Sequence, residues 1–383
     1  MGTRSVFNAA IAAVTALASL ATFAAPFTPG DLAVLRYGDG AETLGSGNAV
    51  SMHVDEYTTA GTFVQSIDLP TSGTGAATAL PGGGREGIVQ LAQDRRSIVV
   101  GGYRAATGTP TTLADKVIAV VRADGSADTA TSYNNVQVGN PIRSVATRDA
   151  TSFYTASDGS NSLAYVPYGA GATAVAIQSG SWRAAHVAND QLYVVSGSSN
   201  FRGISTVGTG LPTSAGQSFA TITPAPNPAT GPGVSSMVIA SDNPNLIYAA
   251  GSALVALDSG TGAGGDDFRR YRFDGTSWVL NGSSAGGIGS PAGSSSAYGV
   301  FTIPDGTGGE VVYLTTSKGI YKVNDANPFG TDFSGLSLVK LVDAPANTEF
   351  RGLAGVPVTV PEPASLGIIA VWLPTLLKRQ CRK

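Results

Sequence analysis

The fold is decided by a stretch near the middle of the chain, WRAAHVANDQLYVVSG at residues 182–197. A strand of small residues comes first, a polar turn follows, and a second strand rich in Val and Tyr ends the stretch. β-Branched and aromatic residues favour strands, whereas Asn and Asp favour turns. The stretch therefore predicts two antiparallel strands.

The same plan recurs along the chain at a spacing of about 40 to 63 residues. A repeat of that length is typical of a four-stranded propeller blade with variable loops. The small residues of each first strand have a physical cause, because innermost strands converge on the propeller axis, where large side chains would collide. The other four copies are GIVQLAQDRRSIVVGGY (87–103), IRSVATRDATSFYTAS (142–157), VSSMVIASDNPNLIYAAG (234–251) and AYGVFTIPDGTGGEVVYLT (297–315).

A sixth copy is divided between the two ends of the repeat region. Residues 350–356 resemble an innermost strand with nothing after it, whereas residues 31–38 and the hairpin at 51–69 resemble three outer strands with nothing before them. Joining them completes a blade and leaves no open sheet edge. We expect an all-β, six-bladed β-propeller over residues 25–357. Seven blades are the alternative, and a two-domain β-sandwich is a rival that lacks an obvious linker.

Charge and composition restrict the partners. The chain has a net charge of −3, but five basic residues lie near its ends, which leaves 18 basic against 26 acidic residues and about −8 for the body. An acidic body lacks the positive surface that nucleic-acid binding requires. With one cysteine, Cys381, and two histidines, His53 and His186, we expect no disulfide, metal site or cofactor.

The N-terminus has the three parts of a signal peptide. Arg4 precedes an apolar run from Ala9 to Ala21, and small residues follow. We expect residues 1–24 to be removed by signal peptidase between Ala24 and Ala25. The alternative is a permanent anchor, but the run is short for a membrane span of about 20 residues.

The C-terminal segment, residues 358–383, contains three features in a fixed order. Pro361-Glu362-Pro363 is followed by an apolar run from Ala364 to Leu377, and a basic cluster ends the chain at Lys378, Arg379, Arg382 and Lys383. Basic residues are retained on the cytoplasmic side, so the body would face outward. The alternative is a C-terminal helix packed on the body.

This ordered trio resembles the PEP-CTERM sorting signal of bacterial surface proteins. The resemblance implies that Pro361, Glu362 and Pro363 are the motif read by an exosortase, that the apolar run is a transmembrane helix, and that the basic cluster stops transfer. It further implies a Gram-negative host, an inner-membrane precursor, and a final place at the cell surface or in an exopolysaccharide matrix such as a biofilm. The run is short, and Pro374 interrupts it.

Short catalytic and metal-binding patterns occur, but their context is wrong. Residues 282–286 fit GxSxG without a following helix, and Gly260, Gly262 and Gly265 fit GxGxxG without a βαβ unit. Two acidic loops could offer oxygen ligands to calcium, but neither matches a full binding loop and solvated turn caps are the favoured interpretation. They contain Asp258, Asp266 and Asp267, and Asn324, Asp325 and Asn327. We predict no catalytic residue.

Four of the six expected innermost strands begin with an arginine: Arg85, Arg143, Arg183 and Arg351. If the blades align, these arginines surround one mouth of the central channel, and guanidinium groups suit carboxylates, including those of acidic sugars. The alternative is that they pair with carboxylates of neighbouring blades, such as Glu86 or Glu349.

The sequence thus predicts an exported, sorted surface or matrix protein whose propeller is an interaction module, with exopolysaccharide as the ligand class to test. The alternative is a propeller-based hydrolase or lyase acting on extracellular carbohydrate, which needs paired carboxylates and a general base at a channel mouth. A structural spacer would have no converging polar groups in its channel.

Overall fold

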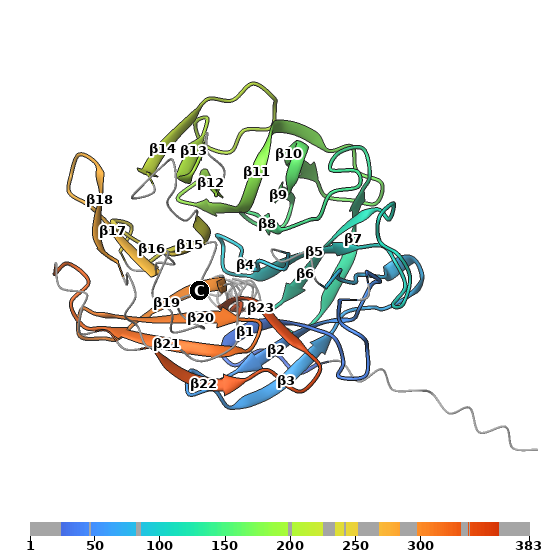
Figure 1. Cartoon of the computed structure of the whole chain (residues 1–383), viewed down its shortest axis with the longest axis horizontal. Helices are drawn as coiled ribbons and strands as arrows, with labels where there is room; N and C mark the ends of the chain where they lie inside the picture. The colour runs from blue at the N-terminus through green and yellow to red at the C-terminus, as the bar shows by residue number, and fades with distance from the viewer. Residues whose placement is uncertain are drawn as a thin grey trace, which may run out of the picture.

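The computed structural model describes residues 24–45, 47–81, 86–197, 201–224, 234–240, 243–251, 268–283, 297–330, 336 and 338–359. These residues form an all-β, propeller-like domain whose sheets stand around a central axis (Figure 1). The predicted signal peptide up to Phe23 and the predicted sorting signal from Val360 onward lie outside the described residues. In the ranges given above, no helix has the length and apolar character to cross a membrane.

Four antiparallel sheets of the described chain have four strands each. In spatial order from the axis outward, the first contains β23 (Glu349–Gly355), β1 (Leu32–Tyr37), β2 (Met52–Tyr57) and β3 (Phe63–Asp68). The second contains β4 (Gln90–Leu91), β5 (Ser97–Tyr103), β6 (Lys116–Arg122) and β7 (Ala127–Tyr133). The third contains β15 (Val234–Ile239), β16 (Leu246–Gly251), β17 (Phe268–Phe273) and β18 (Trp278–Ser283). The fourth contains β19 (Ala297–Pro304), β20 (Glu310–Thr316), β21 (Gly319–Asp325) and β22 (Val339–Asp343). The short 3₁₀ helix η1 (Gly73–Gly75) follows β3.

The fifth sheet has seven strands and corrects the predicted blade count. Its strands are β8 (Ser144–Ala146), β9 (Ser152–Ala156), β10 (Asp158–Pro167), β11 (Val175–Ala188), β12 (Gln191–Ser196), β13 (Gly203–Val207) and β14 (Phe219–Pro224). The prediction of six separate blades is wrong as stated, because β11 continues through Ser179–Ser181, where we expected a break. Its first half pairs with β10 and its second half pairs with β12.

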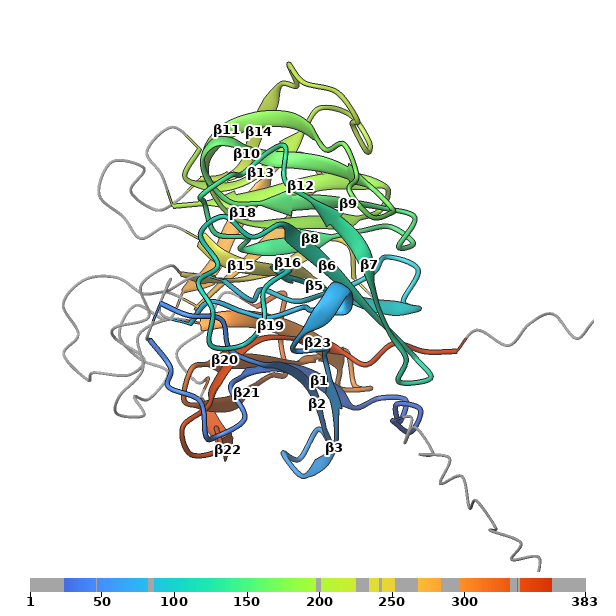
Figure 2. The ribbon, with the colours of Figure 1, turned by 90° about the vertical axis from the view of Figure 1, so that its right-hand side faces the viewer.

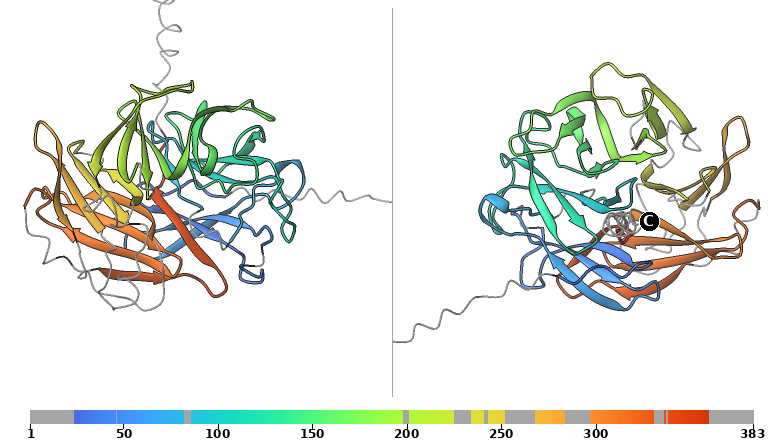
Figure 3. Two further views of the ribbon diagram at one scale, coloured as in Figure 1. Left: turned by 45° about the horizontal axis from the view of Figure 1, so that its top comes forward. Right: turned by 180° about the vertical axis from the view of Figure 1, so that it is seen from behind.

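The ring order is visible from both sides. β4, β8, β15, β19 and β23 lie toward the centre, whereas β3, β7, β14, β18 and β22 lie at the rim (Figure 1), and the view from behind shows the same circular order (Figure 3). The side view places β13 and β14 on the opposite side of the ring from β3 and β22 (Figure 2). Buried hydrophobic clusters fill the spaces between successive sheets and between the two halves of the seven-stranded sheet. Face-to-face packing of neighbouring sheets is therefore the main source of stability.

The ring closes through the pairing of the two ends of the domain, as the sequence predicts. β23 lies beside β1 in antiparallel register, with Leu32 opposite Gly355 and Tyr37 opposite Glu349. Phe350 and Leu353 of β23 are buried together with Leu32 and Val34 of β1. The last strand of the domain thus completes the sheet that the first strand begins.

Close approach at the axis explains the small residues of the innermost strands. A Cβ atom on Gly352 would lie 2.2 Å from the backbone nitrogen of Val89, and one on Gly299 would lie 2.3 Å from that of Leu353. Both neighbours are backbone atoms that cannot rotate away. Larger residues at Gly299 and Gly352 would push the inner strands apart.

The segment that follows the predicted signal-peptide cleavage site is attached to the domain. The backbone nitrogen of Phe27 donates to the carbonyl of Ala123, and the side-chain amide of Gln65 donates to the carbonyl of Ala25. Phe27 is buried, and Ala24 packs against the same cluster. A chain that begins at Ala25 keeps the contacts of Ala25 and Phe27.

Candidate functional site

The starts of four innermost strands lie beside one another, and we name this end of the ring the strand-start mouth. The backbone nitrogen of Gly352 donates to the carbonyl of Gly87 over 2.7 Å, and that of Ile88 donates to the carbonyl of Arg143 over 3.0 Å. The Arg143 guanidinium in turn donates to the carbonyl of Trp182, the residue before Arg183. Arg143, Arg183 and Arg351 therefore lie at the starts of neighbouring inner strands, whereas Arg85 lies outside the described residues.

Arg351 is held by its own blade and its neighbours. Its guanidinium pairs with the carboxylate of Glu349 and lies over the rings of Tyr37 and Tyr298, with its central carbon 4.9 and 4.4 Å from the ring centres. Cation–π contacts of this kind stabilise a desolvated guanidinium. The side chain is buried, so it holds β23 against β1 and β19.

Arg143 is also engaged by the protein. Its Nη2 donates to Oδ2 of Asp158 over 2.7 Å, and its Nη1 donates to the carbonyl of Trp182 over 3.0 Å. Burial acts to raise the pKa of Asp158, but the positive charge of Arg143 beside the carboxylate lowers that pKa overall. For Arg143 and Arg351, pairing with nearby carboxylates is thus the arrangement that the structure shows.

Arg183 differs from both in having no ion pair with a described carboxylate, although Nε and Nη1 of Arg351 and Nε of Arg143 are likewise buried without a hydrogen-bond partner. Only 8% of the residue is exposed, and its Nε and Nη1 atoms are buried without a hydrogen-bond partner. It lies at an irregularity in the pairing of β11 with β12, between Trp182 and Ala184. A buried guanidinium without a counter-charge is costly, and an anionic ligand would remove that cost.

A buried group of titratable side chains lies directly behind the strand-start mouth. Glu86 is 2% exposed and accepts a hydrogen bond from the hydroxyl of Tyr103 over 2.9 Å. Burial raises the pKa of Glu86 to about 7 and lowers the pKa of Lys116, which lies over the Tyr103 ring, to about 8. Because Glu86 is so deeply buried, we assign this group a structural role rather than that of an acid or base reaching a bound sugar.

The second acidic loop considered for calcium has a different role. Asp325 pairs with Arg270 over 2.6 Å and accepts a hydrogen bond from the Tyr248 hydroxyl over 2.7 Å, and all three are buried. This arrangement joins the sheet of β15–β18 to that of β19–β22. The Asn327 side chain accepts from the backbone of Gly330.

Other patterns are not brought into a site by the described chain. Asp258, Asp266 and Asp267, the GxGxxG glycines, and Ser284 to Gly286 of the GxSxG pattern lie outside the described residues. Within those ranges, no group of three His, Cys, Asp or Glu side chains could hold a metal ion.

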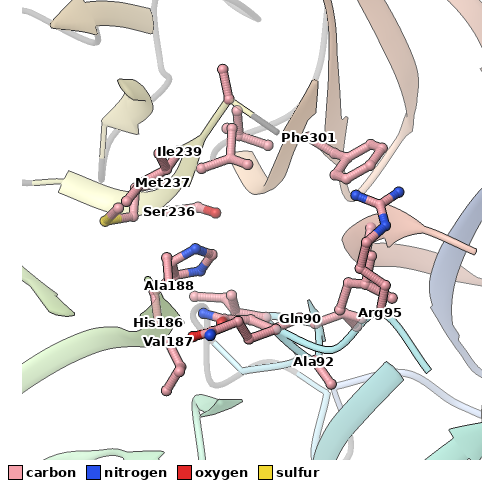
Figure 4. Close-up of a pocket in the computed structure, with 18 of the residues that line it drawn as sticks. Gln90, Ala92, Arg95, His186, Val187, Ala188, Ser236, Met237, Ile239 and Phe301 are labelled. Carbon is pink, nitrogen blue, oxygen red and sulfur yellow. The ribbon is translucent and has the colours of Figure 1, made fainter. Parts of the chain in front are cut away.

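A pocket of about 310 Å³ lies further along the same innermost strands, and we name it the strand-end pocket. His186 and Ser236 face into it from one side, and Arg95 and Phe301 lie across from them (Figure 4). Sequence reasoning missed this pocket. One signal was present, since His186 is a large polar residue that interrupts the small apolar run from Ala184 to Ala188.

Comparison with known proteins does not identify a family. The sequence matches no family model and no curated protein. Among solved structures, the chain is similar to a protein from Lactobacillus plantarum, with a TM-score of 0.44 and 13% identity over 86% of this chain and 89% of that one. It is also similar to a chain of the nidogen/laminin complex, with a TM-score of 0.42 and 8% identity over 84% and 97%. Similarities at this level carry no inference about activity.

Proposed function

We propose that this protein is exported, sorted to the cell surface or extracellular matrix, and binds an anionic polysaccharide at the strand-start mouth of its propeller. The export and sorting parts rest on sequence: the signal peptide at residues 1–24, the motif at 361–363 and the basic cluster at 378–383. Signal peptidase and an exosortase are the processing partners, and the inner membrane holds the precursor.

The observation that supports polysaccharide binding is the state of Arg183. Arg143 and Arg351 already pair with carboxylates, whereas Arg183 has no ion pair in the described chain and two of its guanidinium nitrogens are buried without a partner. A uronic-acid carboxylate would supply the missing acceptor with the planar geometry that a guanidinium recognises. Arg183 is therefore the arginine that we assign to the ligand.

The test is binding of oligogalacturonate, a chain of uronic acids, with maltohexaose as the neutral probe. The wild-type protein should bind the acidic oligosaccharide and not the neutral one. Arg183→Gln should weaken that binding about tenfold or more, because hydrogen bonds to charged groups contribute about 1.5–3 kcal/mol.

Arg148→Gln is the matched control. Arg148 forms an exposed ion pair with Asp190, in which both side chains are 58% exposed, so the substitution removes the same charge from outside the mouth. Equal loss of affinity in both variants would show that binding depends on the overall positive charge of the protein and not on Arg183. Unchanged binding of oligogalacturonate by Arg183→Gln would show that the strand-start mouth is not the binding site.

A further inference from the structure

The strand-end pocket has the size and lining of a site for a small organic ligand. Its volume of about 310 Å³ is at the lower end of the range for ligand pockets. A dry cavity of about 150 Å³ is enough for benzene, so this pocket has room for an apolar body somewhat larger than one ring. The apolar part of its lining includes Ile88, Val300, Phe301 and Leu353.

One wall of the pocket offers uncharged hydrogen-bonding groups. The His186 ring faces the cavity beside Ser236 and Gln90 (Figure 4), and its Nδ1 atom is buried without a partner. Burial lowers the pKa of His186 to about 4, so the imidazole is neutral at pH 7. The Gln90 amide donates to the carbonyl of Ala185, which fixes its side chain in the wall.

The opposite side of the pocket carries a cation. Arg95 lies in the turn between β4 and β5 with a φ of 62°, and its exposed side chain reaches toward Phe301 (Figure 4). No ion pair joins its guanidinium to another described residue. The Arg95 carbonyl accepts a hydrogen bond from the backbone nitrogen of Val358 over 2.9 Å, which attaches this turn to the segment after β23.

A cation at the edge, an apolar interior and neutral polar groups on one wall are complementary to one kind of small molecule. We propose that the strand-end pocket binds a small organic monocarboxylate, with its apolar body beside Val300 and Phe301 and its carboxylate at Arg95. The polar wall at His186 and Ser236 admits a ligand that carries a hydroxyl or carbonyl on its body. This site adjoins the strand-start mouth at Ile88 but contains none of its arginines, and its ligand is much smaller than the proposed polysaccharide.

Phenylacetate and its neutral analogue phenylacetamide are suitable probes because they have nearly the same shape and differ in charge. The readout is the proton NMR spectrum of the imidazole rings, since the chain has only two histidines. His186 lines the pocket, whereas His53 of β2 contacts Asp68 through Nδ1 over 2.6 Å and Ser51 through Nε2 over 2.9 Å. His53 is therefore an internal control for non-specific effects.

Phenylacetate should shift the His186 signals in a saturable way with a Kd near 1 mM or below, which corresponds to about 4 kcal/mol, and should leave His53 unchanged. Phenylacetamide should bind at least about fivefold more weakly. Arg95→Gln should reduce phenylacetate binding to the level of the amide, whereas Arg96→Gln, an exposed neighbour outside this pocket, should not.

Three results would overturn the proposal: no saturable shift of His186 with phenylacetate up to about 10 mM, equal affinity for acid and amide, or equal effects of Arg95→Gln and Arg96→Gln. None of these results bears on Arg183 or on oligogalacturonate. The two binding proposals can therefore fail separately.

Discussion

Ring closure by β23 is open to a direct test at Phe350. This side chain is fully buried and packs with Leu32, Val34 and Tyr313, and its ring meets that of Tyr57 edge-on, with centres 5.7 Å apart. Replacing a buried Phe by Ala usually costs about 3–5 kcal/mol, because apolar contacts are lost and a cavity remains. Phe350→Ala should lower the free energy of unfolding by that amount.

The assay is thermal unfolding followed by circular dichroism. In a large domain, each kcal/mol lowers Tm by about 2 °C, so Phe350→Ala should lower Tm by roughly 6–10 °C. The matched control is Phe329→Ala, whose side chain is 44% exposed and which should change stability by about 0.5 kcal/mol or less. Truncation after Thr348 should destabilise the whole domain. A Phe350→Ala protein with the Tm of the control would refute closure through β23.

Other expectations concern pH, a buried ion pair and processing. His186 has a folded-state pKa of about 4, below its unfolded value of about 6.5, so the unfolded state takes up a proton first and stability falls as pH drops from 6.5 to 4. His186→Gln should remove up to about 3 kcal/mol of this acid-induced loss of folding stability. Urea unfolding at several pH values would measure the difference, and a variant with the same pH profile as the wild type would contradict the prediction. Arg270→Met leaves Asp325 buried without its counter-charge and should cost about 3–5 kcal/mol; a loss below 1 kcal/mol would show that Asp325 finds another partner. N-terminal sequencing of envelope protein should give Ala25, and an intact Met1 would exclude cleavage. Glu362→Ala should leave uncleaved precursor in the inner membrane, as fractionation and mass measurement would reveal; normal processing would argue against motif recognition.

The propeller-like arrangement could be predicted from the sequence because the patterns that indicate it are local. The small first strands, the hairpins and the unmatched strand at residues 350–356 each depend on short segments, and the pairing of β23 with β1 follows from them. The continuity of β11 could not be predicted, since Ser179-Gly180-Ser181 has the composition of a turn. That segment is a strand because Gly159 and Asp158 of β10 lie opposite it.

Which of the arginines has a carboxylate partner could not be predicted without the folded structure. Arg143 finds Asp158 across a sheet, and Arg183 finds no partner, although both begin similar segments in the sequence. The strand-end pocket was missed for a related reason. His186 and Arg95 lie in different repeats, and only the closed ring brings their side chains to opposite sides of one cavity.

The most direct test of polysaccharide binding at the channel is a crystal structure of the protein with oligogalacturonate. Our account predicts a uronate carboxylate within hydrogen-bond distance of the Arg183 guanidinium at the strand-start mouth. Oligosaccharide bound on the outer strands, or an Arg183 guanidinium paired with a carboxylate of the protein itself, would contradict it.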